Sequence, residues 1–145
     1  MRTPGRALGI DAGEVRVGVA ISDDDGTVAS PLLTLPAGEG LAGRVAEIAR
    51  EHRCTTVVVG LPKGLSNRDT ASTQMARRLA KSIEEQGLDV ALWDERLSSA
   101  EAERVLIGAG RRREQRREER DRIAASIILQ GWLDAQRTAR GGDPA

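Results

Sequence analysis

One short run limits the possible folds of this chain more than any other segment, the β-branched and continuously apolar stretch Thr55-Thr56-Val57-Val58-Val59-Gly60. Such a run is typical of a parallel strand that is buried on both faces of a sheet. Parallel neighbours are joined by crossover connections, which are usually helical. The run therefore predicts an α/β domain in which helices cover the sheet.

The segment before this run predicts three antiparallel strands. Residues 6–12 and 15–22 have strand character, and in the second of them apolar and small or polar residues alternate with period two. Asp23-Asp24-Asp25-Gly26 is a strong hairpin signal because an Asp-Gly pair tolerates positive φ. A third strand over about 27–35 completes an antiparallel meander.

The rest of the chain alternates helix and strand. The predicted elements are a helix over 41–53, a strand over 55–60, a loop over 61–68, a helix over 69–86, a strand over 88–93, a short helix over 98–107 and, after an Arg/Glu-rich segment at 111–120, a final helix to about 136. This order is that of the ribonuclease H-like fold, with a five-stranded mixed sheet of a three-strand meander and two parallel strands flanked by helices. We expect one domain over 6–137, with a disordered N-terminus at 1–5 and a disordered tail at 138–145.

Composition narrows the functional classes. The 145 residues contain no Phe or Tyr and only two Trp, which disfavours recognition by base stacking. The 22 basic and 22 acidic residues cancel, so any basic surface must be local. Cys54, the single cysteine, cannot form an internal disulfide and is expected to be a small buried hydrophobe. Neither a membrane span nor a signal peptide is predicted, so we expect a cytoplasmic protein without a membrane partner.

Asp11 ends the first strand, in Gly9-Ile10-Asp11-Ala12-Gly13. A charge inside a sheet is costly unless it is paired or bound to a metal. Gly9, Gly13 and Gly18 leave room around it for an ion and a phosphate. An ordinary hairpin-turn Asp is an equally good interpretation of this residue alone.

Asp94 and Glu95 follow the strand at 88–93, and adjacent residues of an extended chain point to opposite sides. Only one of them is therefore expected to join Asp11, and the periodicity does not choose between them. The alternative is that both are solvated, with Asp94 capping a turn. Arg96 either holds a substrate phosphate or pairs with a neighbouring carboxylate.

Asp121 is predicted in the first turn of the last helix, where the helix dipole favours a carboxylate whatever its function. Its helical face includes Ala124, Ala125 and Ile128, an apolar and partly small stripe that should pack on the sheet. We therefore expect Asp121 to point inward.

Three carboxylates in one pocket repel each other until a cation enters. The hard ion Mg²⁺ suits oxygen ligands of this kind, and Mn²⁺ is a possible substitute. Two such ions roughly 3.5–4 Å apart can activate water and stabilise a leaving oxygen. One Cys and one His make a zinc site improbable.

Basic residues lie in two segments. The loop at 61–68 contains Lys63 and Arg68 and leads to a helix N-terminus, so it either holds a phosphate or is a plain connection; it lacks the P-loop pattern. The stretch at 111–122 is the densest in arginine, diluted by glutamate, and either grips a nucleic-acid backbone or is a solvated helix. The candidate substrate-binding residues are Arg96, Lys63, Arg68, Arg112, Arg113 and Arg117.

Four motifs in order resemble the YqgF family, whose members are described as pre-16S rRNA nucleases and as Holliday junction resolvase-like proteins. They are Gly9-Ile10-Asp11-Ala12-Gly13 with Arg16-Val17-Gly18-Val19-Ala20, then Val59-Gly60-Leu61-Pro62, then Asp94-Glu95-Arg96-Leu97-Ser98, then Asp121 with Ala124-Ala125. The resemblance covers about residues 6–136. It implies that Asp11, Glu95 and Asp121 bind metal, and so favours Glu95 over Asp94. Ala12, where the family commonly has an aromatic residue, and Arg120, where it often has an apolar one, leave substrate preference open.

The leading hypothesis is a Mg²⁺-dependent endonuclease that processes the 5′ region of a small-subunit rRNA precursor. A Holliday junction resolvase would use the same chemistry on branched DNA, as a homodimer rather than a monomer. An actin/Hsp70-like ATPase shares the fold but needs two such domains. A nucleic-acid-binding factor without catalysis would not need the acidic residues.

Overall fold

A computed structural model describes residues 5–97 and 113–139 of the chain. The short helix predicted over 98–107 and the candidate residue Arg112 lie outside the described residues, as do residues 1–4 and 140–145 of the predicted disordered ends.

The core of the fold is a five-stranded sheet in the order β3-β2-β1-β4-β5. β1 pairs antiparallel with β2, and β2 with β3, whereas β4 pairs parallel with both β1 and β5. The predicted meander and the two parallel strands are therefore confirmed. The strands are β1 (Arg6–Asp11), β2 (Arg16–Ser22), β3 (Ala29–Pro36), β4 (Cys54–Leu61) and β5 (Asp89–Asp94).

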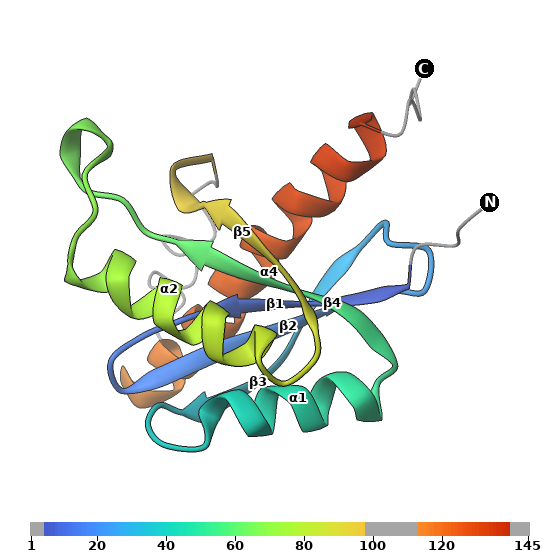
Figure 1. Ribbon diagram of the computed structural model, residues 1–145, viewed down its shortest axis with the longest axis horizontal. Coiled ribbons are helices and arrows are strands. Elements are labelled where there is room, and N and C mark those ends of the chain that lie inside the picture. The colour runs from blue at the N-terminus through green and yellow to red at the C-terminus, as the bar shows by residue number, and fades with distance from the viewer. Residues whose placement is uncertain (1–4, 98–112, 140–145) are drawn as a thin grey trace.

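Helices cover both faces of this sheet (Figure 1). On one face lie α1 (Leu41–Glu51) and α2 (Ala71–Glu84), and on the other lies the long helix α4 (Arg113–Ala139). Two short 3₁₀ turns, η1 (Leu65–Asn67) and η2 (Glu95–Leu97), follow β4 and β5. No helix among the described ranges is both long and apolar enough to cross a membrane.

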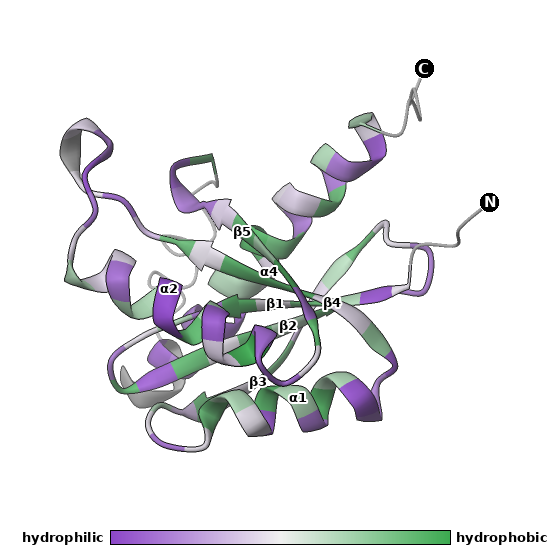
Figure 2. Ribbon diagram, viewed as in Figure 1, coloured by the Kyte–Doolittle hydropathy of each residue, from purple (hydrophilic) through white to green (hydrophobic). Residues whose placement is uncertain are grey.

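Two apolar clusters hold the layers together, and they differ in side-chain size. Leu8 and Ile10 of β1 point into the larger cluster beneath α1 and α2, while Ala7 packs against α4. In Figure 2 the central strands are coloured largely as hydrophobic, which agrees with the burial of their side chains on both faces of the sheet. Cys54 is buried at the start of β4, as predicted.

Glycines let α4 approach the sheet closely. A Cβ added to Gly9 would lie 2.6 Å from the Cβ of Leu129, and one added to Gly18 would overlap the backbone carbonyl of Asp121. Real Cβ atoms do not approach other atoms so closely, so α4 could not occupy this position over larger residues. The close approach fixes which part of α4 lies above the ends of β1 and β2.

The start of α4 differs from the prediction. The helix begins at Arg113 instead of near Asp121, so the Arg/Glu-rich segment belongs to it. Arg and Glu are good helix formers, and they support a solvated helix through i,i+4 pairs. Asp121 therefore lies well inside the helix, and the explanation of this residue by the helix dipole is wrong. The helix also runs to Ala139, past its predicted end at about 136.

Candidate active site

Asp11 is the last residue of β1 and lies on the α4 face of the sheet. It alternates with Ala7, which packs against α4, and with Gly9, whose missing Cβ would meet Leu129 and the carbonyl of Ala125. Its cross-strand partner in β2 is Gly18. A side chain on this face is therefore directed to the region where α4 crosses Gly18.

Asp121 lies in that region. Its backbone packs on Gly18, and its carboxylate accepts a hydrogen bond from Arg16, with 3.0 Å between Arg16 Nε and Asp121 Oδ2. Arg16 stands two residues before Gly18 in β2, so both face α4. The prediction that Asp121 points toward the sheet is confirmed. Its pairing with Arg16 was not predicted, although the period-two pattern of β2 already puts Arg16 and Gly18 on one face.

Glu95 begins η2, directly after β5, and its carboxylate lies over Gly60 of β4. A Cβ added to Gly60 would be 3.0 Å from Glu95 Oε2 and 2.5 Å from Ile128 Cδ1 of α4. Glu95 is therefore on the α4 face, as Asp11 and Asp121 are. Gly60 leaves the space that the glutamate side chain occupies.

Asp94 has a different role in the structure. Its carboxylate accepts hydrogen bonds from the Arg96 backbone N–H at 2.9 Å and from the Arg96 guanidinium, with 2.6 Å between Nη2 and Oδ2. These bonds from Arg96 lower the pKa of Asp94, and Asp94 in turn raises the pKa of Arg96. Arg96 also donates to Asn67 Oδ1 at 3.1 Å. Asp94 thus caps a turn, and Arg96 pairs with its neighbouring carboxylate.

The candidate loop residues Lys63 and Arg68 differ in their surroundings. Lys63 Nζ lies 2.7 Å from Asp69 Oδ1, and hydrogen bonds from Lys63 and Arg77 lower the pKa of Asp69. Arg68 is exposed. The N-terminus of α2 is closed by a capping box in which Thr70 and Thr73 exchange backbone-to-side-chain bonds. Within this loop, Arg68 is therefore better placed than Lys63 to meet a ligand.

On α4, Arg117 is exposed, and Arg113 is the first helical residue. Sequence reasoning missed a groove of about 450 Å³ between α4 and β3, lined by apolar residues of β3 together with Arg16, Thr34, Glu118 and Arg122. Arg122 Nη1 donates to Thr34 Oγ1 at 3.3 Å across it. Thr34 is the β3 partner of Gly18, so it shares a row with Asp11 across β1, β2 and β3.

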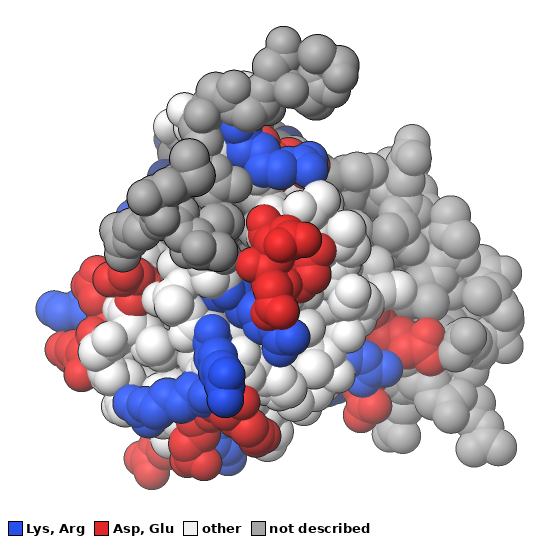
Figure 3. Space-filling model, turned by 90° about the vertical axis from the view of Figure 1, so that its right-hand side faces the viewer, with Lys and Arg blue, Asp and Glu red and all other residues white. Residues whose placement is uncertain are grey.

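Charges elsewhere are mixed. Figure 3 shows acidic and basic side chains interspersed in small clusters on one face. Elsewhere in the chain, Arg6 and Asp24 form an ion pair of 2.6 Å. Such pairing agrees with the zero formal net charge. Among the described residues, Arg16 and Arg122 bring positive charge to the groove beside α4, which also contains Glu118.

The donor chemistry around Gly18 and Gly60 fits a hard divalent cation, because Asp11, Glu95 and Asp121 supply only carboxylate oxygens from one face of the sheet. In the described residues, however, no three His, Cys, Asp or Glu side chains are yet grouped closely enough to hold a metal ion. Arg16 occupies one oxygen of Asp121. Binding a cation would therefore require local movement of these side chains.

A family model described as RuvX, Holliday junction resolvase, matches residues 5–135, nearly the whole chain. The chain belongs to the RuvX family. This is the family that the sequence motifs resemble under the name YqgF.

Close relatives support the assignment of this RuvX protein. Proteins named "Putative pre-16S rRNA nuclease" from Clavibacter sepedonicus and Mycobacterium ulcerans (strain Agy99) are 43% and 44% identical to it. The alignments cover 93% and 95% of this chain and 86% and 84% of the relatives. A protein of the same name from Bacillus cytotoxicus is 41% identical, over 90% of this chain and 99% of the relative. The chain is thus a member of a family of nucleases.

Solved structures identify the fold of this RuvX protein. Thermus thermophilus RuvC in complex with a Holliday junction substrate matches with a TM-score of 0.58 at 17% identity, over 92% of this chain and 96% of RuvC. A second RuvC structure from the same organism matches with a TM-score of 0.55. The predicted ribonuclease H-like fold is confirmed.

Proposed function

We propose that this RuvX protein is a metal-dependent endonuclease that hydrolyses phosphodiester bonds in a precursor of 16S rRNA. The names of its relatives support this substrate, and the alignments span most of each relative's length. The observation that carries the proposal is that Asp11, Glu95 and Asp121, which are far apart in the sequence, all lie on the α4 face of one sheet.

We infer that these three residues hold the cation, with Mg²⁺ as the expected ion and Mn²⁺ as a substitute. When bound, such a cation activates water and neutralises charge on the leaving oxygen. The chain's own residues prepare the site. Gly18 lets the backbone of Asp121 come close to β2, Gly60 makes room for the side chain of Glu95, and Arg16 neutralises Asp121 before a cation enters.

The groove between α4 and β3 is a candidate path for the nucleic-acid strand. Thr34 is two strands from Asp11, a separation of roughly 10 Å at the usual strand spacing. A nucleic-acid strand that is cut at Asp11 can therefore bring one of its nearby phosphates to Thr34 and Arg122. Hydroxyl and guanidinium groups are common phosphate contacts. Arg117 and Arg68, both exposed, would extend this grip.

The test is cleavage of a 16S rRNA precursor and of a four-way DNA junction by purified protein with Mg²⁺, with EDTA as a blank. The proposal predicts metal-dependent cuts in the RNA that Asp11→Asn and Asp121→Asn each abolish. Asp134→Asn, at an exposed acid farther along α4, is the matched control and should cut as the wild type does. Cleavage of the junction alone would instead favour a resolvase, which must act on two strands as a dimer. If the wild type cuts neither substrate, or the variants cut as well as the wild type, the proposal fails.

A further inference from the structure

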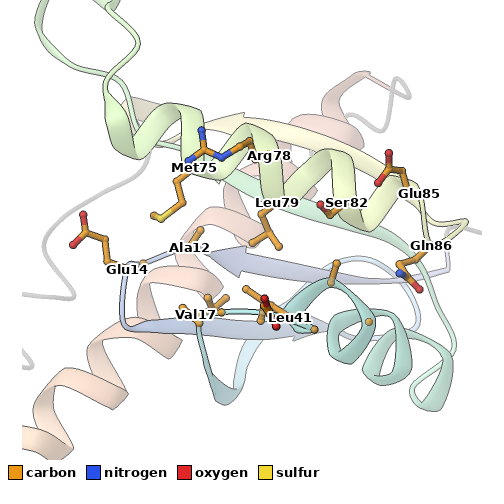
Figure 4. Close-up of a pocket in the computed structure, with 17 residues that line it drawn as sticks. Ala12, Glu14, Val17, Leu41, Met75, Arg78, Leu79, Ser82, Glu85 and Gln86 are labelled. Atoms are coloured by element: carbon orange, nitrogen blue, oxygen red, sulfur yellow. The ribbon is translucent and has the colours of Figure 1, made fainter.

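A second groove of the described structure lies on the opposite face of the sheet from Asp121. It has a volume of about 670 Å³ and runs between α2, the start of α1 and the turn that follows β1. Figure 4 shows Val17, Leu41 and Leu79 directed into its middle. The nuclease chemistry proposed above does not use this groove.

One wall is a continuous face of α2. Met75, Arg78, Leu79 and Ser82 of α2 line the groove, and the residues that follow the helix, Glu85 at its C-cap and Gln86, continue the same wall. The spacing of three and four residues puts those of α2 on one side of the helix. From Met75 to Glu84, the last residue of α2, the helix rises roughly 14 Å. The groove is therefore long, and its shape suits an extended chain better than a compact metabolite.

The two ends of the groove are acidic. Glu14 lies at one end and Glu85 at the other (Figure 4). Glu39 belongs to the Glu14 end, because the loop that contains it is tied to β2 by a hydrogen bond of 3.0 Å from Ala37 N to Val15 O. All three glutamates are exposed, and in the described parts of the chain none of them forms an ion pair. Arg78 is the single basic residue of the lining.

The floor of the groove is open as well as apolar. A Cβ added to Gly38, Gly40 or Gly43 would meet no atom within 4 Å. Met75, whose flexible thioether adapts to varied partners, stands beside this space. The combination is an apolar channel with space to fill and carboxylates at both ends.

We propose that this groove binds an extended segment of a protein partner that has apolar residues in its centre and Lys or Arg on both sides. A segment of about five residues spans roughly 16 Å when extended. The apolar centre would fill the space at Gly43, and the basic side chains would meet Glu14 and Glu39 at one end and Glu85 at the other. The carboxylates repel a nucleic-acid backbone, so the two faces of the sheet serve different partners.

The experiment measures binding of a fluorescein-labelled peptide with two arginines on either side of three leucines, by fluorescence polarisation. The full chain is used without metal or nucleic acid, so the result is independent of nuclease activity. Saturable binding is expected, together with a loss of at least about tenfold in affinity when the arginines of the peptide are replaced by glutamates.

Two variants test the location. Gly43→Leu fills the open space at a helical position and should weaken binding at least about tenfold. The combined variant Glu14→Gln, Glu39→Gln and Glu85→Gln keeps the shape of the groove and should do the same. The control is Glu47→Gln, at an exposed position of α1 outside the groove, which should bind as the wild type does.

Several results would overturn the proposal. They are the absence of saturable binding, equal affinity for the arginine and glutamate peptides, and unchanged binding by the combined glutamine variant. That variant decides the question even if Gly43→Leu does not fold, which its thermal unfolding curve would reveal.

Discussion

The carboxylate of Asp121 forms an ion pair with Arg16. The side chain of Arg16 is 29% exposed and that of Asp121 is 21% exposed. A cation that binds Asp121 has to compete with this guanidinium. We predict that Arg16→Gln strengthens Mn²⁺ binding about two- to fivefold, since a partly exposed pair contributes up to about 1 kcal/mol. Isothermal titration calorimetry without nucleic acid measures this affinity directly.

The matched control for that measurement is Arg137→Gln. Arg137 also lies in an ion pair, 2.8 Å from Asp134, but on the far part of α4. Its loss should leave Mn²⁺ binding unchanged. Weaker binding by Arg16→Gln would mean that Arg16 supports the site instead of competing for it.

Cys54 makes the stability of the fold depend on pH in the alkaline range. Burial raises the pKa of this thiol to about 11, above its ordinary value of about 8.5 in an unfolded chain. The raised folded-state pKa means that the contribution is complete below about pH 8.5 and is lost as the pH rises toward 11. We predict that Cys54→Val makes the urea midpoint fall less between about pH 8 and about pH 10.5. An equal fall in both proteins would show that the thiol is not responsible.

Single residues also show where sequence reasoning stops. Adjacent positions such as Asp94 and Glu95 have the same chemistry in the sequence, and only the backbone turn into η2 separates their directions. Arg96 then captures Asp94, while Gly60 makes room for Glu95. The family resemblance favoured Glu95 over Asp94. The periodicity of the sequence could not distinguish them, because the turn breaks the strand pattern at this point.

Among the elements, the contact between α4 and β2 depends on a missing side chain. A Cβ at Gly18 would overlap the backbone of Asp121, whereas one at Gly43 in α1 would meet nothing within 4 Å. We predict that Gly18→Ala lowers the free energy of unfolding by about 1–3 kcal/mol through overpacking. Gly43→Ala should raise it by about 0.5–1 kcal/mol, because alanine is the better helix former. Urea denaturation of both variants compares these effects, and similar shifts in the two would refute the argument.

The groove between α4 and β3 makes a separate prediction for substrate binding. We expect Arg122→Gln to raise the KM for RNA about tenfold, since a hydrogen bond to a charged group contributes about 1.5–3 kcal/mol. The kcat should change little, because the guanidinium of Arg122 is directed to Thr34, which lies two strands of the sheet away from Asp11. Arg137→Gln is again the control, and a fall in kcat at constant KM would contradict a strand-binding role.

The boundary of α4 was the main error in predicting the elements. A dense Arg/Glu segment has no apolar stripe, so it gave no periodic signal for the helix that it forms. Within α4, apolar residues occur only after Asp121. A helix that starts in solvent and then crosses the sheet cannot be delimited by its buried residues alone.

At the scale of the whole molecule, the fold was predictable from local pattern. The alternation in β2, the Asp-Gly hairpin and the apolar run of β4 together predicted a three-strand meander with two parallel strands, and the structure adds the order β3-β2-β1-β4-β5. The grooves on the two faces were not predictable. Both arise where helices pack over the ends of strands, and such packing depends on distances that one sequence does not contain.

We propose that one face of this RuvX sheet is the nuclease site and that Glu95, not its neighbour Asp94, belongs to it. The most direct measurement is single-turnover cleavage of the 16S rRNA precursor by Glu95→Gln and by Asp94→Asn under the same Mg²⁺ conditions. We predict that Glu95→Gln lowers the cleavage rate more than about a hundredfold. This loss is larger than the one expected for a residue that only hydrogen-bonds to a metal ligand. Asp94→Asn should stay within about tenfold of the wild type. A rate near that of the wild type for Glu95→Gln, or the larger loss in Asp94→Asn, would contradict the account.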